Sequence, residues 1–392
     1  MFRYRFFYTM ALAAALLFYL FFTGYLSFFL LALLLLLPVV SFLLTVLAVC
    51  KTEVHMETGT PFVLKNDVFP LRITMKNESI LPIAQAELRF TCENSLCGEK
   101  RKETLSLPVG TGPKRTVEYQ LSSQYCGKIT TELSALIFYD YLGIFRIKRK
   151  PEISAVCYAA PLAMLPDAQF DDRSDHSGLE SSTYSKIKPG DDPSELFQIR
   201  TYREGDRLRS IHWKLSTRLD ELMVKEFSLP TDSRVLVLAE LMAADMDALD
   251  TVVETLASFS AFLLDREIVH SIGWYGESGY SETRIETGDD QAAVFHALLG
   301  ARSYHSKPYS FLSAVENSME KYPHVIYITG MLTDELTRFR SEPENNVELK
   351  ILYCGKMDEP QKAMAGKLDN SKTELLEIPV GTTQAGLSGF TL

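Results

Sequence analysis

Residues Arg200 to Glu226 read RTYREGDRLRSIHWKLSTRLDELMVKE, and the rest of the sequence is best understood from this stretch outward. It holds seven basic residues and Trp213, although the whole chain of 392 residues carries a formal net charge of -10. Gathering cations around an aromatic residue is unfavourable unless anionic groups, in the fold or on a partner, compensate them. The basic residues are Arg200, Arg203, Arg207, Arg209, Lys214, Arg218 and Lys225.

A tight turn is predicted at Glu204-Gly205-Asp206, because Gly205 can adopt the positive φ that such turns need. Extended segments are predicted on both sides, and alternate residues of an extended segment share a face. One face then carries Arg200, Tyr202 and Glu204, and the other carries Arg209, Ile211 and Trp213.

We expect an internal network of ion pairs to compensate the positive charge of these basic side chains. Arg209 is placed to meet Asp206 or Glu204, and a guanidinium group suits bidentate pairing with a carboxylate. Arg218, Lys225 and Glu226 could extend the network, and an anionic lipid headgroup or phosphate is the alternative partner.

His212 and Ser216 are the candidate catalytic pair in this stretch. No identifiable nucleophile elbow accompanies them, and the position of an acidic third member cannot be derived from spacing. We therefore predict a structural histidine, and we predict that Trp213 is a core or interface anchor.

A membrane anchor is predicted at the N-terminus, since no charged residue occurs in the 45 residues from Phe6 to Cys50. Two spanning helices of roughly 20 residues fit this run, at about Phe6–Phe22 and Phe28–Cys50. Gly24 and Ser27 mark the turn, and membrane helices tolerate Pro38. A cleaved signal peptide is the alternative, but its apolar core spans only about 7–15 residues.

Charges at the ends of the run predict its orientation. Arg3 and Arg5 precede the first helix and Lys51 follows the second, so both ends are expected in the cytoplasm. The six scattered cysteines are predicted to be free thiols of a reducing compartment, although Cys92 and Cys97 could bridge a hairpin. The acidic balance argues against nucleic acid as a partner.

Residues 53–160 are predicted to form an all-β sandwich, because short alternating runs recur between turn-forming residues. Such a domain serves as a spacer or binding module. Residues 161–199, rich in Asp, Ser, Pro and Gly, are predicted to be a linker or surface loop. The strands are expected at Leu71–Met75, Ala84–Phe90, Thr116–Leu121 and Ile129–Phe138.

Residues 233–392 are predicted to form an open, mostly parallel α/β sheet, because buried apolar runs alternate with helical spacing. The tail Leu375–Leu392 is expected to add one strand. The other predicted strands are Val235–Leu238, Ile268–Trp274, Val325–Ile328 and Leu349–Tyr353, and the predicted helices are Asp247–Leu264, Gln291–Leu299 and Phe311–Lys321.

The stretch resembles the signature of the bacterial domain-of-unknown-function family 58. The matching residues are Arg200-x-Tyr202-x-x-Gly205-Asp206-x-x-Arg209-x-Ile211-His212-Trp213-Lys214-x-Ser216-x-Arg218, then Leu222-x-Val224-Lys225-Glu226. Thr217 stands where the family usually has Ala. The layout also resembles the family: an apolar hairpin (1–52), a β-rich segment (53–160) whose Asp140–Phe145 matches an Asp-Pro-Phe-Gly-Leu-like element, the signature (200–232) and an α/β domain (233–392).

The resemblance implies a multidomain protein whose α/β domain is similar to von Willebrand factor A domains, which are Rossmann-like. It also implies partners, since members are usually encoded beside MoxR-type AAA+ ATPases and often with a transglutaminase-like membrane protein. The usual suggestion for the family is assembly or chaperone-like work at the membrane. It supplies no catalytic residues.

A magnesium site is the one cofactor that the resemblance raises. Factor A domains often bind Mg²⁺ through Asp-x-Ser-x-Ser after the first strand, with Thr and Asp ligands on later loops. Here the first strand continues into Ala239-Glu240-Leu241-Met242-Ala243, and a later one ends in Thr329-Gly330. Glu240, Asp245, Thr329 and Asp334 could rebuild a site of oxygen ligands, but we predict a degenerate site with no metal and no cofactor.

The sequence therefore predicts a two-helix protein of the cell membrane with cytoplasmic soluble domains, working as a protein-interaction or assembly factor. The alternatives are a metal-dependent hydrolase using the rim of the α/β sheet and an extracellular adhesion module.

Overall fold

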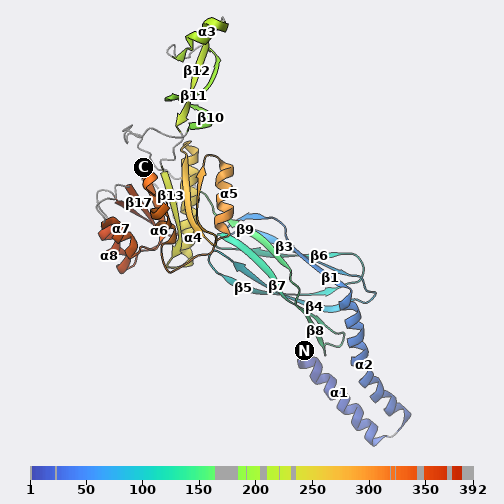
Figure 1. Cartoon of the computed structure of the whole chain (residues 1–392). Coiled ribbons are helices and arrows are strands. Elements are labelled where there is room, and N and C mark those ends of the chain that lie inside the picture. The colour runs from blue at the N-terminus through green and yellow to red at the C-terminus, as the bar shows by residue number, and fades with distance from the viewer. Residues whose placement is uncertain are drawn as a thin grey trace. The chain divides into compact units, whose positions relative to one another are not determined.

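A computed structural model gives the fold in two units, which are described separately (Figure 1). Unit 1 is Met1–Leu162 with His296–Ser303, and unit 2 is Ala163–Phe295 with Tyr304–Leu392. The structure describes residues 2–22, 24–163, 184–190, 192–203, 210–219, 221–230, 235–317, 319–322, 324–341, 348–368 and 373–381.

Two N-terminal helices are long and apolar enough to cross a membrane: α1 (Phe2–Phe21) and α2 (Tyr25–Cys50). Their mean hydropathies are 1.5 and 2.9 over the candidate spans. Gly24 is the N-cap of α2, and its N–H donates to Ser27 Oγ at 3.1 Å. The two helices and the turn at Gly24 are confirmed, although both helices begin earlier than predicted.

The last part of α2 packs against the β-rich part of unit 1. One stripe of this segment is buried, at the spacing of a helix face. It consists of Ser41, Thr45, Ala48 and Val49. Ala48 and Val49 belong to the same hydrophobic core as Leu71 and Phe138, so the end of α2 is a structural part of the β-rich region.

Two sheets form the β-rich region, with orders β1-β3-β6 and β2-β9-β7-β4-β5, and β8 pairs with β7. Both sheets supply buried side chains to one core, among them Leu71 and Ile73 from one and Leu88 and Phe138 from the other. All four predicted strands are present. The strands are β1 (Thr52–Thr58), β2 (Phe62–Leu64), β3 (Val68–Asn77), β4 (Ile83–Asn94), β5 (Lys100–Val109), β6 (Arg115–Ser122), β7 (Gly127–Tyr139), β8 (Arg146–Arg149) and β9 (Ser154–Ala160).

The signature segment belongs to a small antiparallel sheet with order β10-β12-β11. Its elements are β10 (Tyr184–Gly190), β11 (Asp192–Thr201), α3 (Trp213–Leu219) and β12 (Met223–Pro230). The prediction of a loop is therefore wrong for residues 184–190 and 192–199, because both strands pair with β12 and this pairing outweighs their turn-rich composition. Residues 164–183 of the predicted linker lie outside the described residues.

The rest of unit 2 contains a six-stranded sheet with order β15-β14-β13-β16-β17-β18. All neighbouring strands are parallel except β14 and β15, so the prediction of a mostly parallel α/β sheet is confirmed. The strands are β13 (Val235–Ala243), β14 (His270–Gly276), β15 (Gly279–Ile285), β16 (His324–Gly330), β17 (Glu348–Cys354) and β18 (Thr373–Ile378).

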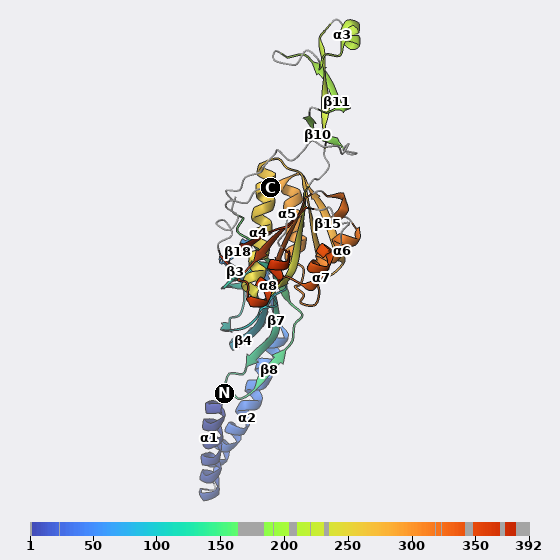
Figure 2. The same cartoon turned by 90° about the vertical axis from the view of Figure 1, so that its left-hand side faces the viewer.

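Helices cover both faces of this sheet, which is why every residue of β13 is buried. Figure 2 shows α4 on one face and α6 on the other. β15, α7 and α8 were not predicted; a short turn after Gly276, closed by Gly279 at φ +101°, folds β15 back on β14. The helices are α4 (Met246–Asp265), α5 (Gly288–Leu299), α6 (Tyr309–Asn317), the 3₁₀ turn η2 (Met319–Lys321), α7 (Asp334–Ser341) and α8 (Glu359–Leu368).

Candidate functional site

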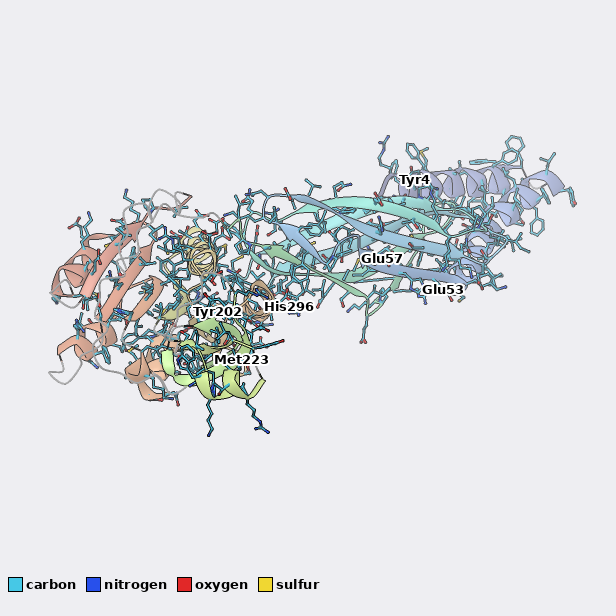
Figure 3. All side chains as sticks on the ribbon, turned by 90° about the horizontal axis from the view of Figure 1, so that it is seen from above. Tyr4, Glu53, Glu57, Tyr202, Met223 and His296 are labelled. Carbon is cyan, nitrogen blue, oxygen red and sulfur yellow. The ribbon has the colours of Figure 1, made fainter. Side chains whose placement is uncertain are left out.

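The signature segment holds α3 against β12 through backbone contacts. The N–H of Tyr202 donates to the carbonyl of Leu222 at 2.8 Å, and the N–H of His212 donates to that of Met223 at 2.8 Å. Ile211, which is 5% exposed, forms an isolated antiparallel bridge with Val224. Tyr202 and Met223 both lie on this segment (Figure 3). The residues before and after the predicted turn therefore both pair with the segment 222–224.

Ser216 is the side chain that fastens α3. Its buried hydroxyl donates to the carbonyl of His212 at 3.1 Å and accepts the N–H of Met223 at 2.9 Å. The ring of His212 accepts the N–H of Leu215 through Nδ1 at 3.2 Å, which satisfies one amide at the start of the helix. Ser216 thus bonds the backbone of His212 rather than its ring, an arrangement that positions a helix and does not activate a nucleophile.

The structure contradicts part of the predicted arrangement around Trp213. Ile211 forms only an isolated bridge, and Trp213 is the first residue of α3. Trp213 is 61% exposed, so it is not a core anchor. Alternation along a strand therefore no longer places its side chain with that of Ile211, which is buried.

An exposed surface results, and we call it the α3 surface. It is defined by Trp213, Lys214, Arg218 and Leu222, all of which are exposed. The family departure Thr217 lies beside it, and its hydroxyl donates to the carbonyl of Trp213 at 2.9 Å. A Thr is accommodated here because its side chain bonds back to its own helix.

The remaining signature residues fall into two groups. Arg200, Lys225 and Glu226 lie in β11 and β12, where Arg200 is opposite Val224 and its Nη1 donates to the carbonyl of Thr201 at 3.0 Å. Gly205, Asp206 and Arg209 lie outside the described residues, so the predicted ion pair of Arg209 stays a prediction.

Glu240 lies at the centre of a buried polar cluster in unit 2. It is 0% exposed in β13, and its carboxylate accepts the N–H groups of Ser310 and Phe311, both at 3.1 Å, at the start of α6. The hydroxyl of Tyr327 donates to it at 3.0 Å, and that of Tyr304 donates to its other oxygen. Removal from water raises the pKa of the Glu240 carboxyl, although the four hydrogen bonds oppose this shift.

The other predicted metal positions also have protein partners. The hydroxyl of Thr329 donates to the carbonyl of Met331 at 2.8 Å and accepts its N–H at 3.1 Å. Asp245 is the N-cap of α4 and accepts the N–H of Ala248 at 2.7 Å, while Asp334 lies in the first turn of α7. These residues therefore do not fit a magnesium site, since the two central candidates already make protein hydrogen bonds. Among the described residues, no three His, Cys, Asp or Glu side chains are grouped to hold a metal ion.

The carboxyl ends of β13 and β16, where a parallel sheet usually binds its ligand, lie close together. From β13 the chain continues to β14 and β15 on one side of the sheet and then returns to β16 on the other side of β13. Ligands of open α/β sheets bind at such a point, where the strand order changes direction. β13 and β16 pair again at Ala243 and Gly330, and a Cβ on Gly330 would lie 2.5 Å from that of Ala243. This close contact brings the two strand ends together at the usual position of a ligand.

Three of the solved structures that the chain matches are only distantly similar to it. An alkylpurine DNA glycosylase, AlkC, of Pseudomonas fluorescens shows 11% identity over 33% of this chain and 38% of its own, with a TM-score of 0.19. A CARDB domain from Pyrococcus furiosus shows 11% identity over 28% and 87%, with a TM-score of 0.20. The sporulation control protein Spo0M of Bacillus subtilis shows 8% identity over 27% and 49%, with a TM-score of 0.18. The chain thus spans well under two thirds of the first and third of these proteins, and TM-scores this low carry no argument.

A family comparison gives a specific result where the structural one does not. No curated protein matches the chain. The family described as "Protein of unknown function DUF58" matches residues 198–321, which include the signature from Arg200 to Glu226 and continue through β13 and α6. The resemblance predicted from the signature is confirmed, since residues 198–321 of this chain match the DUF58 family.

Proposed function

We propose that this chain is a membrane-anchored protein-interaction factor whose α3 surface docks a partner protein. The observation that carries the proposal is the 61% exposure of Trp213. A large aromatic side chain exposed in water loses the favourable free energy of burial, which a partner's pocket would restore. Trp and Arg are also the residue types most enriched at the energetic centres of protein interfaces.

The composition of the α3 surface favours an acidic partner. Lys214 and Arg218 are exposed on the same helix as Trp213, and Glu221 and Leu222 are exposed just beyond it, so basic side chains outnumber the acidic one. An aromatic residue with basic neighbours suits a partner face that combines an apolar pocket with carboxylates, because complementary charge guides association and fixes orientation. This arrangement favours binding of a partner protein, and not catalysis, as the role of the signature segment.

The finer identity of the partner follows from the family. We propose that the chain acts with a MoxR-type AAA+ ATPase, with a transglutaminase-like membrane protein as a second partner, and that its α/β domain is of the von Willebrand factor A type. The basic residues Arg3, Arg5 and Lys51 at the ends of the helical pair support cytoplasmic soluble domains. A reporter that is active only in the cytoplasm, fused to the C-terminus, tests this topology.

Pull-down of the co-expressed ATPase from solubilised membranes tests the docking proposal. Trp213→Ala should lower the recovered ATPase at least tenfold, since interface hot spots contribute about 2 kcal/mol or more. Val68→Ala is the matched control, because Val68 is 63% exposed but lies in β3 of unit 1. Equal recovery by wild type and Trp213→Ala would refute docking at the α3 surface, and no recovery by wild type even after crosslinking would refute the partner.

A further inference from the structure

The loop Asp140–Phe145 connects β7 to β8 and is built around one buried carboxylate. Asp140 is 3% exposed, and its side chain accepts the N–H of Phe145 at 2.8 Å and the hydroxyl of Ser41 in α2 at 2.9 Å. Gly143, at φ +69°, closes the turn and leaves room for Tyr4 of α1, whose ring a Cβ would approach to 3.3 Å. The loop is therefore shaped to fit both N-terminal helices.

Contacts with α1 and α2 fix the level of this loop along the helical pair. Nε of Arg5 donates to the carbonyl of Ile144 at 2.9 Å, and the rings of Phe42 and Phe145 lie 5.4 Å apart. The stretches from Phe6 to Phe21 and from Tyr25 to Val40 each rise about 24 Å. Arg5 and Ser41 therefore lie at one level, the same distance from the turn at Gly24.

That level corresponds to the edge of the hydrocarbon layer if the helices span a membrane. A charged side chain such as Arg5 is costly within the hydrocarbon and is placed at its boundary. About 24 Å is somewhat less than a typical hydrocarbon thickness of about 30 Å, a mismatch that bilayers accommodate by thinning. Tyr141 and Phe145, each 41% exposed, would then lie in the interfacial layer that aromatic residues prefer.

The next strand adds positive charge at the same end of unit 1. β8 reads Arg146-Ile147-Lys148-Arg149, and Lys150 follows. Nη1 of Arg149 donates to the carbonyls of Val49 and Thr52 at 3.0 and 3.2 Å, where a basic group stabilises the C-terminus of α2. Glu87 lies near Arg146, and Glu152 is exposed beyond Lys150, so the net charge of the segment remains positive.

We propose that the loop Asp140–Phe145 and β8 form a rim that binds acidic phospholipid headgroups, a proposal that rests on the proposed membrane anchoring. The aromatic rings of Tyr141 and Phe145 enter the interfacial layer. The exposed side chains of Arg3, Lys148 and Lys150 contact lipid phosphate groups. A lipid surface is favoured over free phosphate because β8 directly follows an aromatic loop that lies at the level of Arg5, and each basic residue near an anionic surface strengthens attraction to it.

The charge part of the proposal is tested with the full-length chain in bilayers of phosphatidylcholine with spin-labelled phosphatidylglycerol. Wild type should bind the labelled anionic lipid severalfold more strongly than labelled phosphatidylcholine. The double variant Lys148→Gln/Lys150→Gln should lose most of this preference, and Lys100→Gln/Lys102→Gln, at the opposite end of β4 and β5, should keep it. No preference in wild type, or equal preference in both double variants, would overturn the proposal. Displacement of the labelled lipid by millimolar inorganic phosphate would also overturn it.

The depth part is tested by lipids brominated near the headgroup. Tryptophan placed by Phe145→Trp should add emission that these lipids quench, whereas tryptophan at Val68→Trp, at the far end of β3, should not be quenched. Equal quenching at the two positions would contradict the assigned level. Resistance of the protein to alkaline carbonate extraction separately reports the anchor, so a retained protein without lipid preference fails only this proposal.

Discussion

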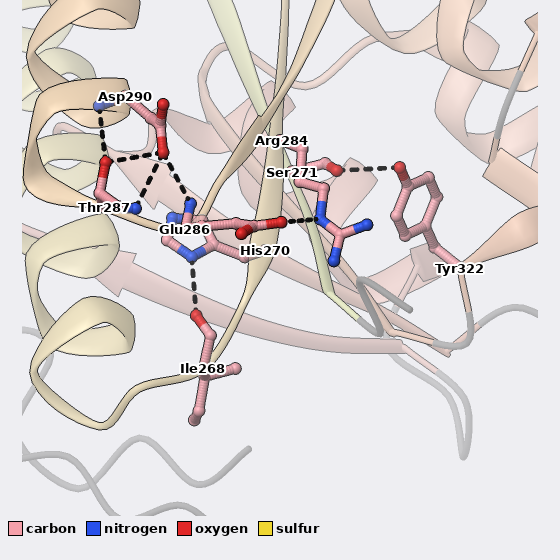
Figure 4. Close-up of polar contacts among 8 residues, drawn as sticks. All are labelled: Ile268, His270, Ser271, Arg284, Glu286, Thr287, Asp290 and Tyr322. Atoms are coloured by element: carbon pink, nitrogen blue, oxygen red, sulfur yellow. Dashed lines mark hydrogen bonds and ion pairs between the residues drawn. The ribbon is translucent and has the colours of Figure 1, made fainter. Parts of the chain in front are cut away.

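His270 shows how a single buried side chain makes the α/β part sensitive to acid. It is 0% exposed in β14, and its Nδ1 lies 3.1 Å from the carbonyl of Ile268 (Figure 4). A carbonyl can only accept, so Nδ1 carries the proton, and Nε2 accepts the hydroxyl of Ser260 at 2.8 Å. Burial lowers the pKa of His270 from 6.5 to about 4, because the charged ring would lose its hydration.

Stability should therefore fall as the pH drops from about 6.5 toward 4. The unfolded chain binds a proton on His270 below pH 6.5, whereas the folded chain does so only near pH 4, so the contribution is complete above 6.5 and is lost on acidification. The loss from this residue is about 3 kcal/mol. Urea unfolding followed by the fluorescence of Trp274, in a Trp213→Phe background, measures it. His270→Gln should flatten the profile, and an unchanged slope in that variant would contradict the assignment.

Glu240 and Trp213 mark what residue types alone can predict. Glu240 was found from the sequence as the lone carboxylate after the first strand, where a metal ligand would stand. Its four donors could not be found, because Tyr304, Ser310 and Tyr327 come from positions distant in the sequence. The sequence predicts Trp213 as a core or interface anchor, because tryptophan is usually well buried, and the exposure that excludes the core depends on where α3 begins.

The helix α3 is short, so its stability depends on contacts with β12. Ser216 provides one of them, since its hydroxyl accepts the N–H of Met223, and it also donates to the carbonyl of His212 just before the helix. Ser216→Ala should raise the hydrogen-exchange rate of the Met223 amide and of the α3 amides by about fivefold, since a net hydrogen bond contributes about 1 kcal/mol. Thr217→Ala is the matched control, because Thr217 is exposed and bonds only within its own helix. Equal exchange in both variants would show that Ser216 does not fasten the helix.

Elements were predictable where burial imposes a periodic pattern. The run Val235–Leu238 is apolar at every position because helices cover both faces of β13, and the alternation in Ile129–Phe138 reflects the packing of β7 in unit 1. β10 and β11 were not predicted because Asp, Ser, Pro and Gly are frequent in the segment 161–199 that contains most of both strands. Only their pairing with β12, which is distant along the chain, makes them strands. A loop can be predicted from neighbouring residues alone, whereas the pairing that makes these segments strands involves residues elsewhere in the chain.

At the scale of the molecule, α2 serves two environments in turn. Its first half is exposed along most of its surface, as a lipid-facing helix would be in the absence of lipid. Its second half contributes Ala48 and Val49 to the core shared with β3, β4 and β7. The sequence predicted one uniform spanning helix, because both kinds of burial select apolar residues. A change from lipid to protein contact leaves no mark on hydropathy.

This double role predicts where the chain can be shortened. A chain beginning at Ser41 keeps the buried stripe of α2, whereas one beginning at Lys51 leaves the core around Leu71 and Phe138 uncovered. The longer chain should be more stable by about 3 kcal/mol in unit 1, since the shorter one lacks Ala48 and Val49 and the apolar burial that they provide. Hydrogen exchange of the β4 and β7 amides should accordingly be roughly a hundredfold slower in the longer chain. Val49→Asp in the longer chain should abolish the gain, because it buries an unpaired charge. If both chains exchange alike, the end of α2 is an attachment to the membrane and not a part of the core.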